Sequence, residues 1–208
     1  MKKVILTALL VAMAVCTLAP GAGARDKITA ITYNVGIPVN NVEDYIDNVS
    51  WRGFGIDFRH FRSRSKPFTV GFSFAWQVFD QRLDNETFVF DSGAVTGTQR
   101  RYLNSLPFLL TGHWYSSQQP NKTRIFLGGG AGVYYIEQRF DIGVSTRQEN
   151  NWHFGLMPEV GIQFPFGDVE LLLSGRYHYA FAAGTSLTGE SQAWDYITVN
   201  AGVAWSRW

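Results

Sequence analysis

Cysteine is almost absent from this chain of 208 residues, and a single cysteine excludes a scaffold held together by disulfide bonds. Charged residues are also scarce, at 17% against the roughly 25% usual for a soluble domain. The formal net charge of +1 argues against a nucleic-acid-binding protein. Aromatic residues, at 15%, and glycines, at 21, are abundant instead. The length suits a single domain with a sizeable core.

Long apolar runs are missing except at the N-terminus. Lys2 and Lys3 precede an apolar stretch over residues 4–18, and a small-x-small pattern at Ala22 and Ala24 follows. This order is typical of a signal peptide over residues 1–24, cleaved after Ala24. The run is short for a transmembrane helix, although an uncleaved anchor is the alternative. We expect residues 25–208 to form one exported domain without any cysteine.

The rest of the chain shows the two-residue period of β-strands. Successive side chains of a strand point to opposite faces, so each segment has one large apolar face and one small or polar face. The clearest example has alternating large apolar residues at Phe68, Val70, Phe72, Phe74, Trp76 and Val78. The pattern predicts eight strands, over residues 27–38, 49–62, 67–80, 100–115, 123–138, 151–166, 168–182 and 195–207.

The predicted strands and their connections are typical of a membrane barrel. Each segment exceeds the usual five or six residues of a globular strand and reaches the about 9–11 residues that a tilted strand needs to cross a bilayer. Short connections at residues 63–66, 116–122 and 167–168 alternate with long ones at 39–48, 81–99, 139–150 and 183–194. Bacterial outer-membrane barrels combine short periplasmic turns, long external loops and an even strand number.

The two faces of the strands also favour lipid outside and a filled interior. Because backbone polar groups in hydrocarbon must be paired within the protein, the sheet must close on itself. A soluble lipocalin-like barrel would have the opposite polarity. Aromatic side chains near the strand ends suit the two membrane interfaces; these are Trp51, Trp76, Trp114, Tyr115, Trp152, Phe166, Tyr179 and Trp205. The predicted inward set includes Gly53, Gly55, Gly71, Gly128, Gly130, Gly132, Gly161 and Gly202. We therefore expect an all-β, eight-stranded, antiparallel, up-and-down transmembrane β-barrel.

The C-terminal residues Gly202-Val203-Ala204-Trp205-Ser206-Arg207-Trp208 resemble the last strand of the small OmpA, OmpX and opacity-type outer-membrane barrels. The resemblance implies a monomer in the outer membrane, in contact with lipid and lipopolysaccharide. It also implies that the barrel-assembly machinery reads this strand. Val203 and Trp205 have the expected phase, whereas Trp208 lies one residue out of it.

Several charged residues fall on the predicted inward face, where an unpaired charge is costly. An eight-stranded barrel is just wide enough for side chains to fill it. We therefore interpret this set as a polar network that closes the lumen. A narrow channel for small solutes or apolar molecules, lined by the same side chains, is the alternative. The set comprises Asp57, Arg59, His113, Glu159, Glu170, Arg176 and His178.

A catalytic interpretation depends on His178. The segment Arg176-Tyr177-His178-Tyr179-Ala180-Phe181 is similar to a strand of lipid A deacylases, in which a serine closely follows the histidine. Ala180 stands where that serine is expected, so the histidine lacks a nucleophile to activate. We expect no enzyme, although a lipid A-modifying activity centred on His178 is a further alternative. The four histidines show no metal-ligand spacing, and no metal or cofactor is expected.

The long connections provide the candidate external sites. Residues 39–48 include Glu43 and Asp44, and residues 81–99 include Asp84, Glu86, Phe88 and Phe90. Apolar residues in a long external loop can mark a binding site for a partner. Residues 87–90 could instead extend the barrel wall as a hairpin. We expect a non-catalytic surface role, structural or adhesion-like, carried by four external loops.

Overall fold

The structure is a computed structural model that describes residues 27–63, 66–90, 93–119, 122–143, 145–185, 187 and 191–207. For residues 85, 86, 88–90, 93, 95 and 207 only the backbone is described. The predicted signal peptide, its cleavage site and Trp208 lie outside the described residues. Within the described ranges, no helix is long and apolar enough to cross a membrane.

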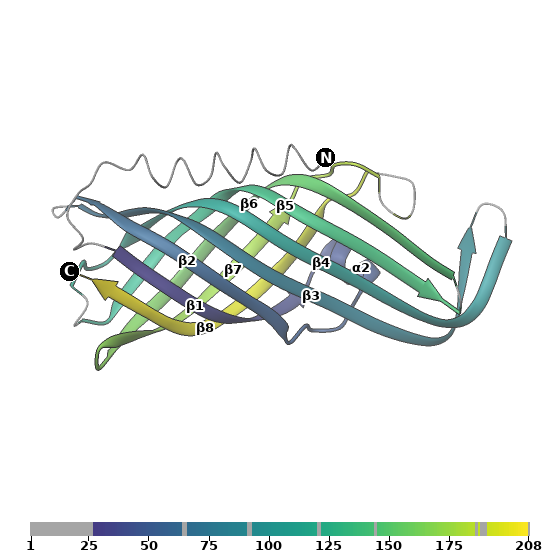
Figure 1. Ribbon diagram of the computed structural model, residues 1–208, viewed down its shortest axis with the longest axis horizontal. Helices are drawn as coiled ribbons and strands as arrows, with labels where there is room; N and C mark the ends of the chain where they lie inside the picture. Colours follow the sequence, from purple (N-terminus) through teal and green to yellow (C-terminus); the bar gives the residue numbers. More distant parts are fainter. Residues whose placement is uncertain are drawn as a thin grey trace.

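Eight antiparallel strands form a closed barrel (Figure 1). Each strand pairs with the next, and β8 pairs with β1 from Lys27↔Arg207 to Pro38↔Tyr196, which closes the ring. The all-β, eight-stranded antiparallel fold predicted from the sequence is confirmed. The elements are β1 (Lys27–Pro38), α2 (Asn40–Tyr45), β2 (Arg52–Ser63), β3 (Lys66–Phe90), β4 (Gly93–Tyr115), β5 (Arg124–Ile142), β6 (Ser145–Phe166), β7 (Val169–Ala180) and β8 (Trp194–Arg207).

Four consecutive strands, β3 to β6, continue beyond the predicted bounds. They extend past the ends of the other strands, to the right in Figure 1. The predicted loops over residues 81–99 and 139–150 consist mostly of paired strand, and residues 87–90 do extend the wall as a hairpin. Here the apolar alternation fades although backbone pairing continues, so the sequence pattern ends earlier than the strands. We call residues 79–90, 93–103, 138–142 and 145–149 the protruding sheet.

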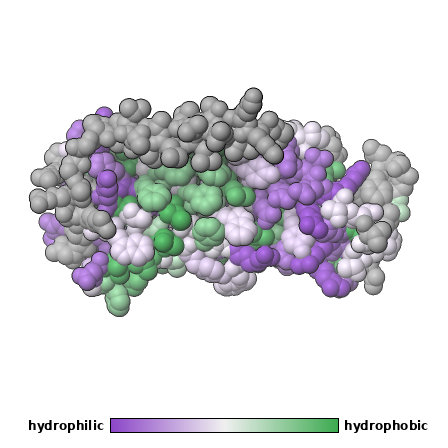
Figure 2. Space-filling model, in the orientation of Figure 1, coloured by the Kyte–Doolittle hydropathy of each residue, from purple (hydrophilic) through white to green (hydrophobic). Residues whose placement is uncertain are grey.

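The outer surface of the barrel is apolar and its interior is largely polar, as the strand pattern predicts. Outward side chains include Leu110 (64% exposed) and Leu127 (62% exposed). Hydrophobic residues gather over the barrel wall on the face shown in Figure 2. On the face in view, the hydrophilic surface begins where the protruding sheet leaves the barrel. Tyr115, predicted at an outer interface, is instead fully buried inside. Adjacent residues of a strand face opposite sides, so only Trp114 of this pair can point outward.

Glycines permit the close approach of neighbouring strands around the narrow lumen. A Cβ at Gly128 would lie 2.1 Å from the carbonyl oxygen of Gly112 and 2.7 Å from Cα of His113. Backbone atoms cannot move away as a flexible side chain can. At Gly161, a Cβ would instead meet the ring of Phe126, at 2.3 Å. These positions give inward side chains room at the level where the charged residues lie.

Replacing Gly128 by alanine should therefore destabilise the barrel by about 1–3 kcal/mol, the usual cost of overpacking. Gly175→Ala is the matched control, because no atom lies within 4 Å of a Cβ added there. Urea unfolding in lipid vesicles, followed by tryptophan fluorescence, measures both changes. Equal stabilities of the two variants would show that the strands can separate without cost at Gly128.

Candidate functional site in the barrel lumen

The lumen contains a cluster of charged side chains contributed by four strands. Asp57 and Arg59 come from β2, His113 from β4, Glu159 from β6 and Arg176 from β7, and each is at most 2% exposed. Glu159 and Arg176 are direct cross-strand partners, whereas β2 approaches them from across the lumen. We call these five residues the charged layer.

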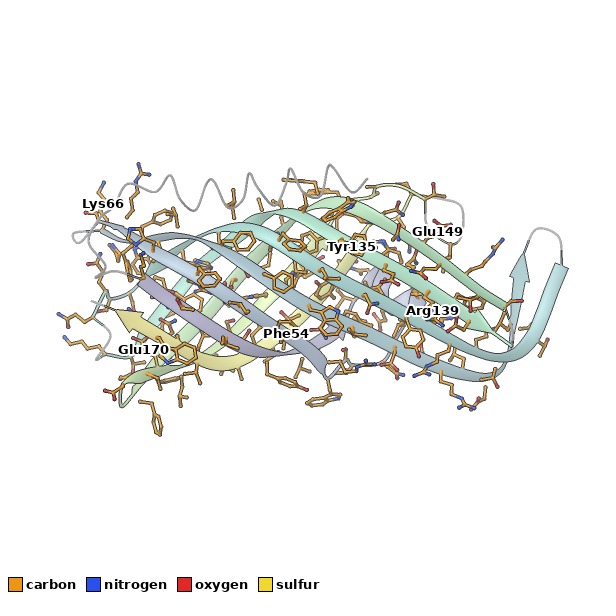
Figure 3. The ribbon with its side chains drawn as sticks, viewed as in Figure 1. Phe54, Lys66, Tyr135, Arg139, Glu149 and Glu170 are labelled. Atoms are coloured by element: carbon orange, nitrogen blue, oxygen red, sulfur yellow. The ribbon has the colours of Figure 1, made fainter. Side chains whose placement is uncertain are left out.

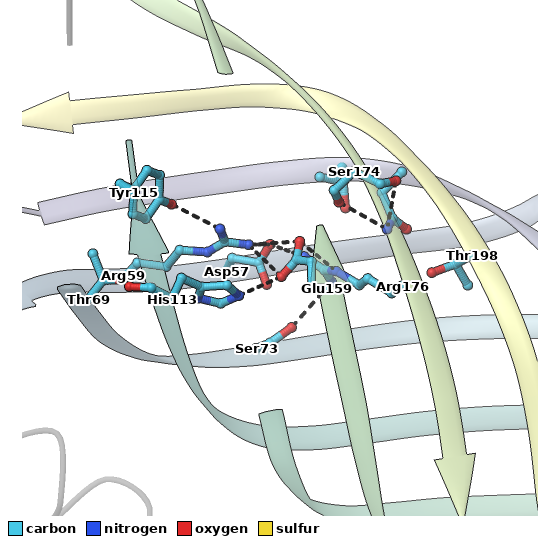
Figure 4. A network of polar contacts seen from close by, with 12 residues as sticks. Asp57, Arg59, Thr69, Ser73, His113, Tyr115, Glu159, Ser174, Arg176 and Thr198 are labelled. Carbon is cyan, nitrogen blue, oxygen red and sulfur yellow. Dashed lines mark hydrogen bonds and ion pairs between the residues drawn. The ribbon is translucent and has the colours of Figure 1, made fainter. Parts of the chain in front are cut away.

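Glu159 is the central acceptor of the charged layer (Figure 4). Both of its carboxylate oxygens lie 3.0 Å from Nη2 of Arg59. Nε of Arg176 lies 3.0 Å from Oε1, and Nε2 of His113 lies 2.7 Å from Oε2. One carboxylate therefore connects three strands, β2, β4 and β7, to β6.

Asp57 is the second carboxylate and joins the same two arginines. It accepts a hydrogen bond from Nη2 of Arg176 and lies 3.4 Å from Nη2 of Arg59. The Tyr115 hydroxyl accepts from Nη1 of Arg59 at 2.9 Å. Two carboxylates and two guanidinium groups thus balance in charge, which is how such groups are tolerated without water.

Apolar side chains, interspersed with buried uncharged polar ones such as Gln77 and Gln163, lie on both sides of the charged layer. Towards the short turns lies an inner apolar layer, formed by Ile28, Ala30, Phe61, Tyr115, Phe126, Leu172 and Ala204. Towards the protruding sheet lies an outer apolar layer, formed by Val42, Ile46, Phe79, Leu103, Leu109, Tyr134, Ile136, Met157, Ala180, Trp194 and Tyr196. Three successive layers of side chains therefore occupy the barrel.

Helix α2 closes the outer mouth, although the sequence suggests an external loop there. Val42 and Ile46 are fully buried in the outer apolar layer. Tyr45 donates a hydrogen bond to the Arg139 carbonyl at 2.9 Å, and Nη1 of Arg101 donates to the Tyr45 carbonyl at 3.1 Å. Burial raises the pKa of the Tyr45 hydroxyl, which keeps it protonated as a donor.

Glu170 does not join the charged layer, although we grouped it with those residues from the sequence. It lies at the level of the inner apolar layer, as the cross-strand partner of Ala204, where Nη2 of Arg124 donates to it and the Ser206 hydroxyl donates at 3.1 Å. Nε of Arg124 also donates to Gln163 at 2.9 Å. Arg124 was not among the inward residues predicted from the sequence. Arg124 lies two residues before Phe126 and four before Gly128, and residues at such even spacings on a strand face the same side, which indicates an inward position.

His178 also stands apart from the hydrogen bonds of the charged layer. Its ring stacks on Tyr196 with centroids 4.6 Å apart, and Nδ1 lies 3.1 Å from the Tyr134 hydroxyl. Nε2 lies 3.3 Å from the Thr198 hydroxyl. Ser174, the nearest serine along β7, accepts a hydrogen bond from Asn200 at 3.2 Å. Enclosed between two tyrosines, the imidazole is 2% exposed.

The predicted external residues are spread over separate elements. Glu43 and Asp44 are exposed on α2. Asp84 lies on β3, where it pairs with Arg82 at 3.0 Å and accepts from the Thr98 hydroxyl at 3.2 Å. Glu86, Phe88 and Phe90 continue the same strand, but their side chains lie outside the described part of the structure. Among the described residues, no cluster of three His, Cys, Asp or Glu side chains could hold a metal ion.

Comparisons with known proteins give structural similarity but no relative in sequence. No protein-family model matches the chain, and no curated protein matches its sequence. The attachment invasion locus protein Ail of Yersinia pestis is similar in structure, with a TM-score of 0.47 and 12% identity over 88% of this chain and 97% of Ail. Neisserial surface protein A has a TM-score of 0.48 and 14% identity, over 86% of this chain and 96% of its own.

Removing Arg59 from the charged layer should strongly destabilise the fold. Arg59→Met keeps most of the side-chain volume but leaves Glu159 with one guanidinium fewer, and breaking a buried pair costs about 3–5 kcal/mol. Arg82→Met is the matched control, because this side chain is 68% exposed and its pair with Asp84 contributes about 1 kcal/mol at most. Urea unfolding in vesicles should separate the two variants clearly. Similar losses would mean that the charged layer does not hold the barrel together.

Proposed function

We propose that this protein is a barrel of the bacterial outer membrane that binds a partner at the cell surface through its protruding sheet. The apolar outer band supports the membrane location, because such a surface is stable in hydrocarbon and not in water. In this arrangement the short turns face the periplasm and the protruding sheet faces outward. The barrel is proposed to act as a monomer, to contact lipid and lipopolysaccharide, and to depend on the barrel-assembly machinery for insertion.

The observation that carries the surface role is that the protruding sheet has two free edges. Strand β3 pairs with β2 only as far as Val78, so no strand among the described residues pairs with residues 79–90 on that side. Strand β6 pairs with β7 only from Gly155 onward. Along residues 145–149, its outer edge likewise has no partner strand in the described part of the chain. Unpaired N–H and C=O groups of an edge strand can bind an extended segment of another protein.

The side chains of the protruding sheet suit contact with water and with a polar partner. Its arginines and carboxylates form exposed pairs, such as Arg139 with Asp141 at 3.0 Å (Figure 3 labels Arg139 and Glu149). Such exposed pairs contribute little to stability and exchange partners readily. They therefore do not explain, by themselves, why four strands extend beyond the membrane. A binding role for the sheet does.

The filled lumen argues against the channel alternative. A solute would have to displace the outer apolar layer, the charged layer and the inner apolar layer in turn. The lipid A-modifying alternative is disfavoured by the position of His178. Its imidazole faces the lumen between Tyr134 and Tyr196, whereas lipid substrates lie against the outer surface. We therefore propose a non-catalytic role.

Shortening the hairpin between β3 and β4 tests the proposed surface role. Leu83 and Gln99 are cross-strand partners, so replacing residues 84–98 by Asn-Gly should re-close the hairpin with a two-residue turn. Expressed on a non-adherent bacterial host, this variant should lose attachment to cultured cells about tenfold or more, equivalent to about 1.4 kcal/mol. Heat-dependent gel mobility would verify that the barrel is intact.

The matched control for the hairpin variant carries Glu43→Gln and Asp44→Asn. Both residues are exposed on α2, outside the protruding sheet, so attachment should persist. Full attachment by the shortened hairpin, or its loss in this control, would show that the sheet is not the binding surface.

Conductance in a planar bilayer tests the closed lumen. The refolded protein should give no steady openings. A variant with Val42→Gly and Ile46→Gly, which thins the outer apolar layer, should also be silent, because the charged layer still closes the barrel. Steady conductance of the unmodified protein would instead favour the channel.

A further inference from the structure

A group of exposed cations lies at one side of the barrel end that carries the short turns. Lys27 begins β1, Arg62 lies near the end of β2, and Lys66 begins β3 (Figure 3 labels Lys66). All three are exposed. Lys27 is the cross-strand partner of His60, and Lys66 pairs with Ser63, so adjacent strands carry the three side chains. We call them the basic rim.

The basic rim has no acidic partner among the described residues. The acidic side chains described at this end are Glu170 and Asp168. Glu170 is buried, forms an ion pair with Arg124 and accepts a hydrogen bond from Ser206. Asp168 lies in the β6–β7 turn, on the opposite side of the ring from the β2–β3 turn. Cations that lie on adjacent strands in this way attract an anion.

Exposed aromatic rings lie next to these cations on the outer surface. Phe68 and Trp114 are cross-strand partners, 40% and 53% exposed, and Trp205 of β8 is 42% exposed. Lys66 precedes Phe68 by two residues, which places its Cα about 7 Å further from the centre of the barrel wall. Tryptophan at a strand end prefers the headgroup level of a bilayer. The basic rim therefore lies at the depth of lipid phosphates, a level that a free polymer in the periplasm does not share.

The opposite side of this barrel end has no comparable group of cations. The β6–β7 turn follows Phe166, which is 66% exposed, and contains Gly167 and Asp168 but no cation. Lys122, in the β4–β5 turn, is a further exposed cation at this end. The described cations therefore gather around the β2–β3 and β4–β5 turns, and the lipid phosphates that they can reach are those beside this part of the barrel.

Resting on the proposed membrane location, we infer that Lys27, Arg62 and Lys66 bind the phosphate groups of anionic glycerophospholipids in the periplasmic leaflet. Each guanidinium or ammonium group would contact a phosphate oxygen, while Trp114 and Trp205 pack against the adjoining acyl chains. Near an anionic membrane surface, each cation favours the charged lipid by about fivefold.

Quenching of tryptophan by brominated lipids measures this preference directly. The full chain is refolded into phosphatidylcholine vesicles that contain either dibrominated phosphatidylglycerol or dibrominated phosphatidylcholine. The phosphatidylglycerol should quench more strongly, and the difference should shrink in high salt. The variant K27Q/R62Q/K66Q should lose at least about fivefold of the preference, whereas the charge-conserving variant K27R/R62K/K66R should keep it.

The outcomes separate this inference from the membrane proposal. Equal quenching of the unmodified protein by both lipids, or an unchanged preference in K27Q/R62Q/K66Q, overturns the inference alone. Absence of quenching by either lipid shows that the chain has not inserted and defeats the membrane location as well. If K27Q/R62Q/K66Q loses co-sedimentation with peptidoglycan sacculi but keeps its lipid preference, the basic rim binds an anionic polymer and the inference is wrong.

Discussion

The ion pairs of Glu159 are the interaction on which the interior of this barrel depends. A strand that crosses lipid must direct its polar side chains inward, and eight strands leave only a narrow space for them. Glu159 meets this constraint by accepting from Arg59 and Arg176, with His113 as a third partner. Each arginine is shared with Asp57. Removing either arginine or either carboxylate leaves a charge that water cannot reach.

This arrangement also explains why the lumen is a poor place for function. The charged layer is compensated internally, and apolar side chains cover it on both sides. A ligand for these residues would have to replace contacts that already satisfy them. The protruding sheet is in the opposite situation, because its edges have backbone groups that no strand in the described part of the chain pairs. The proposed binding role therefore falls to this end of the molecule, where the wall continues without closing.

Much of the fold was predictable because the two-residue period is local. Alternation around residues 68–78 is enough to assign which side chains face inward, and β1 has the predicted bounds. The partners of Glu159 were not predictable, because β2 and β6 are not neighbours and no local pattern relates their registers. Arg124 was missed because it begins a strand, where a cation is usually exposed to water. Val42 of α2 and Ile46, which follows the helix directly, are spaced four residues apart, as buried residues of one helix face are. A helical segment of six residues is too short for this spacing to predict a helix.

The strand lengths have a similar explanation. The apolar alternation of β3 ends near Val78, whereas hydrogen bonding to β4 needs only a backbone and continues to Phe90. The alternation in the sequence thus marks the extent of the apolar outer surface better than the length of the strand.

The two ends of the barrel differ in a way that follows from their surroundings. The outer end has long paired strands, exposed ion pairs such as Arg139 with Asp141, and a helix folded into the mouth. The inner end has short turns, aromatic rings at the wall, and a basic rim that no carboxylate among the described residues neutralises. Paired charges suit a surface that must stay soluble and selective towards proteins, because they present both signs and little net field. Unpaired cations beside Trp114 suit a surface that meets a layer of phosphates. The same chain thus carries two kinds of surface, and the closed, internally neutral lumen keeps them apart.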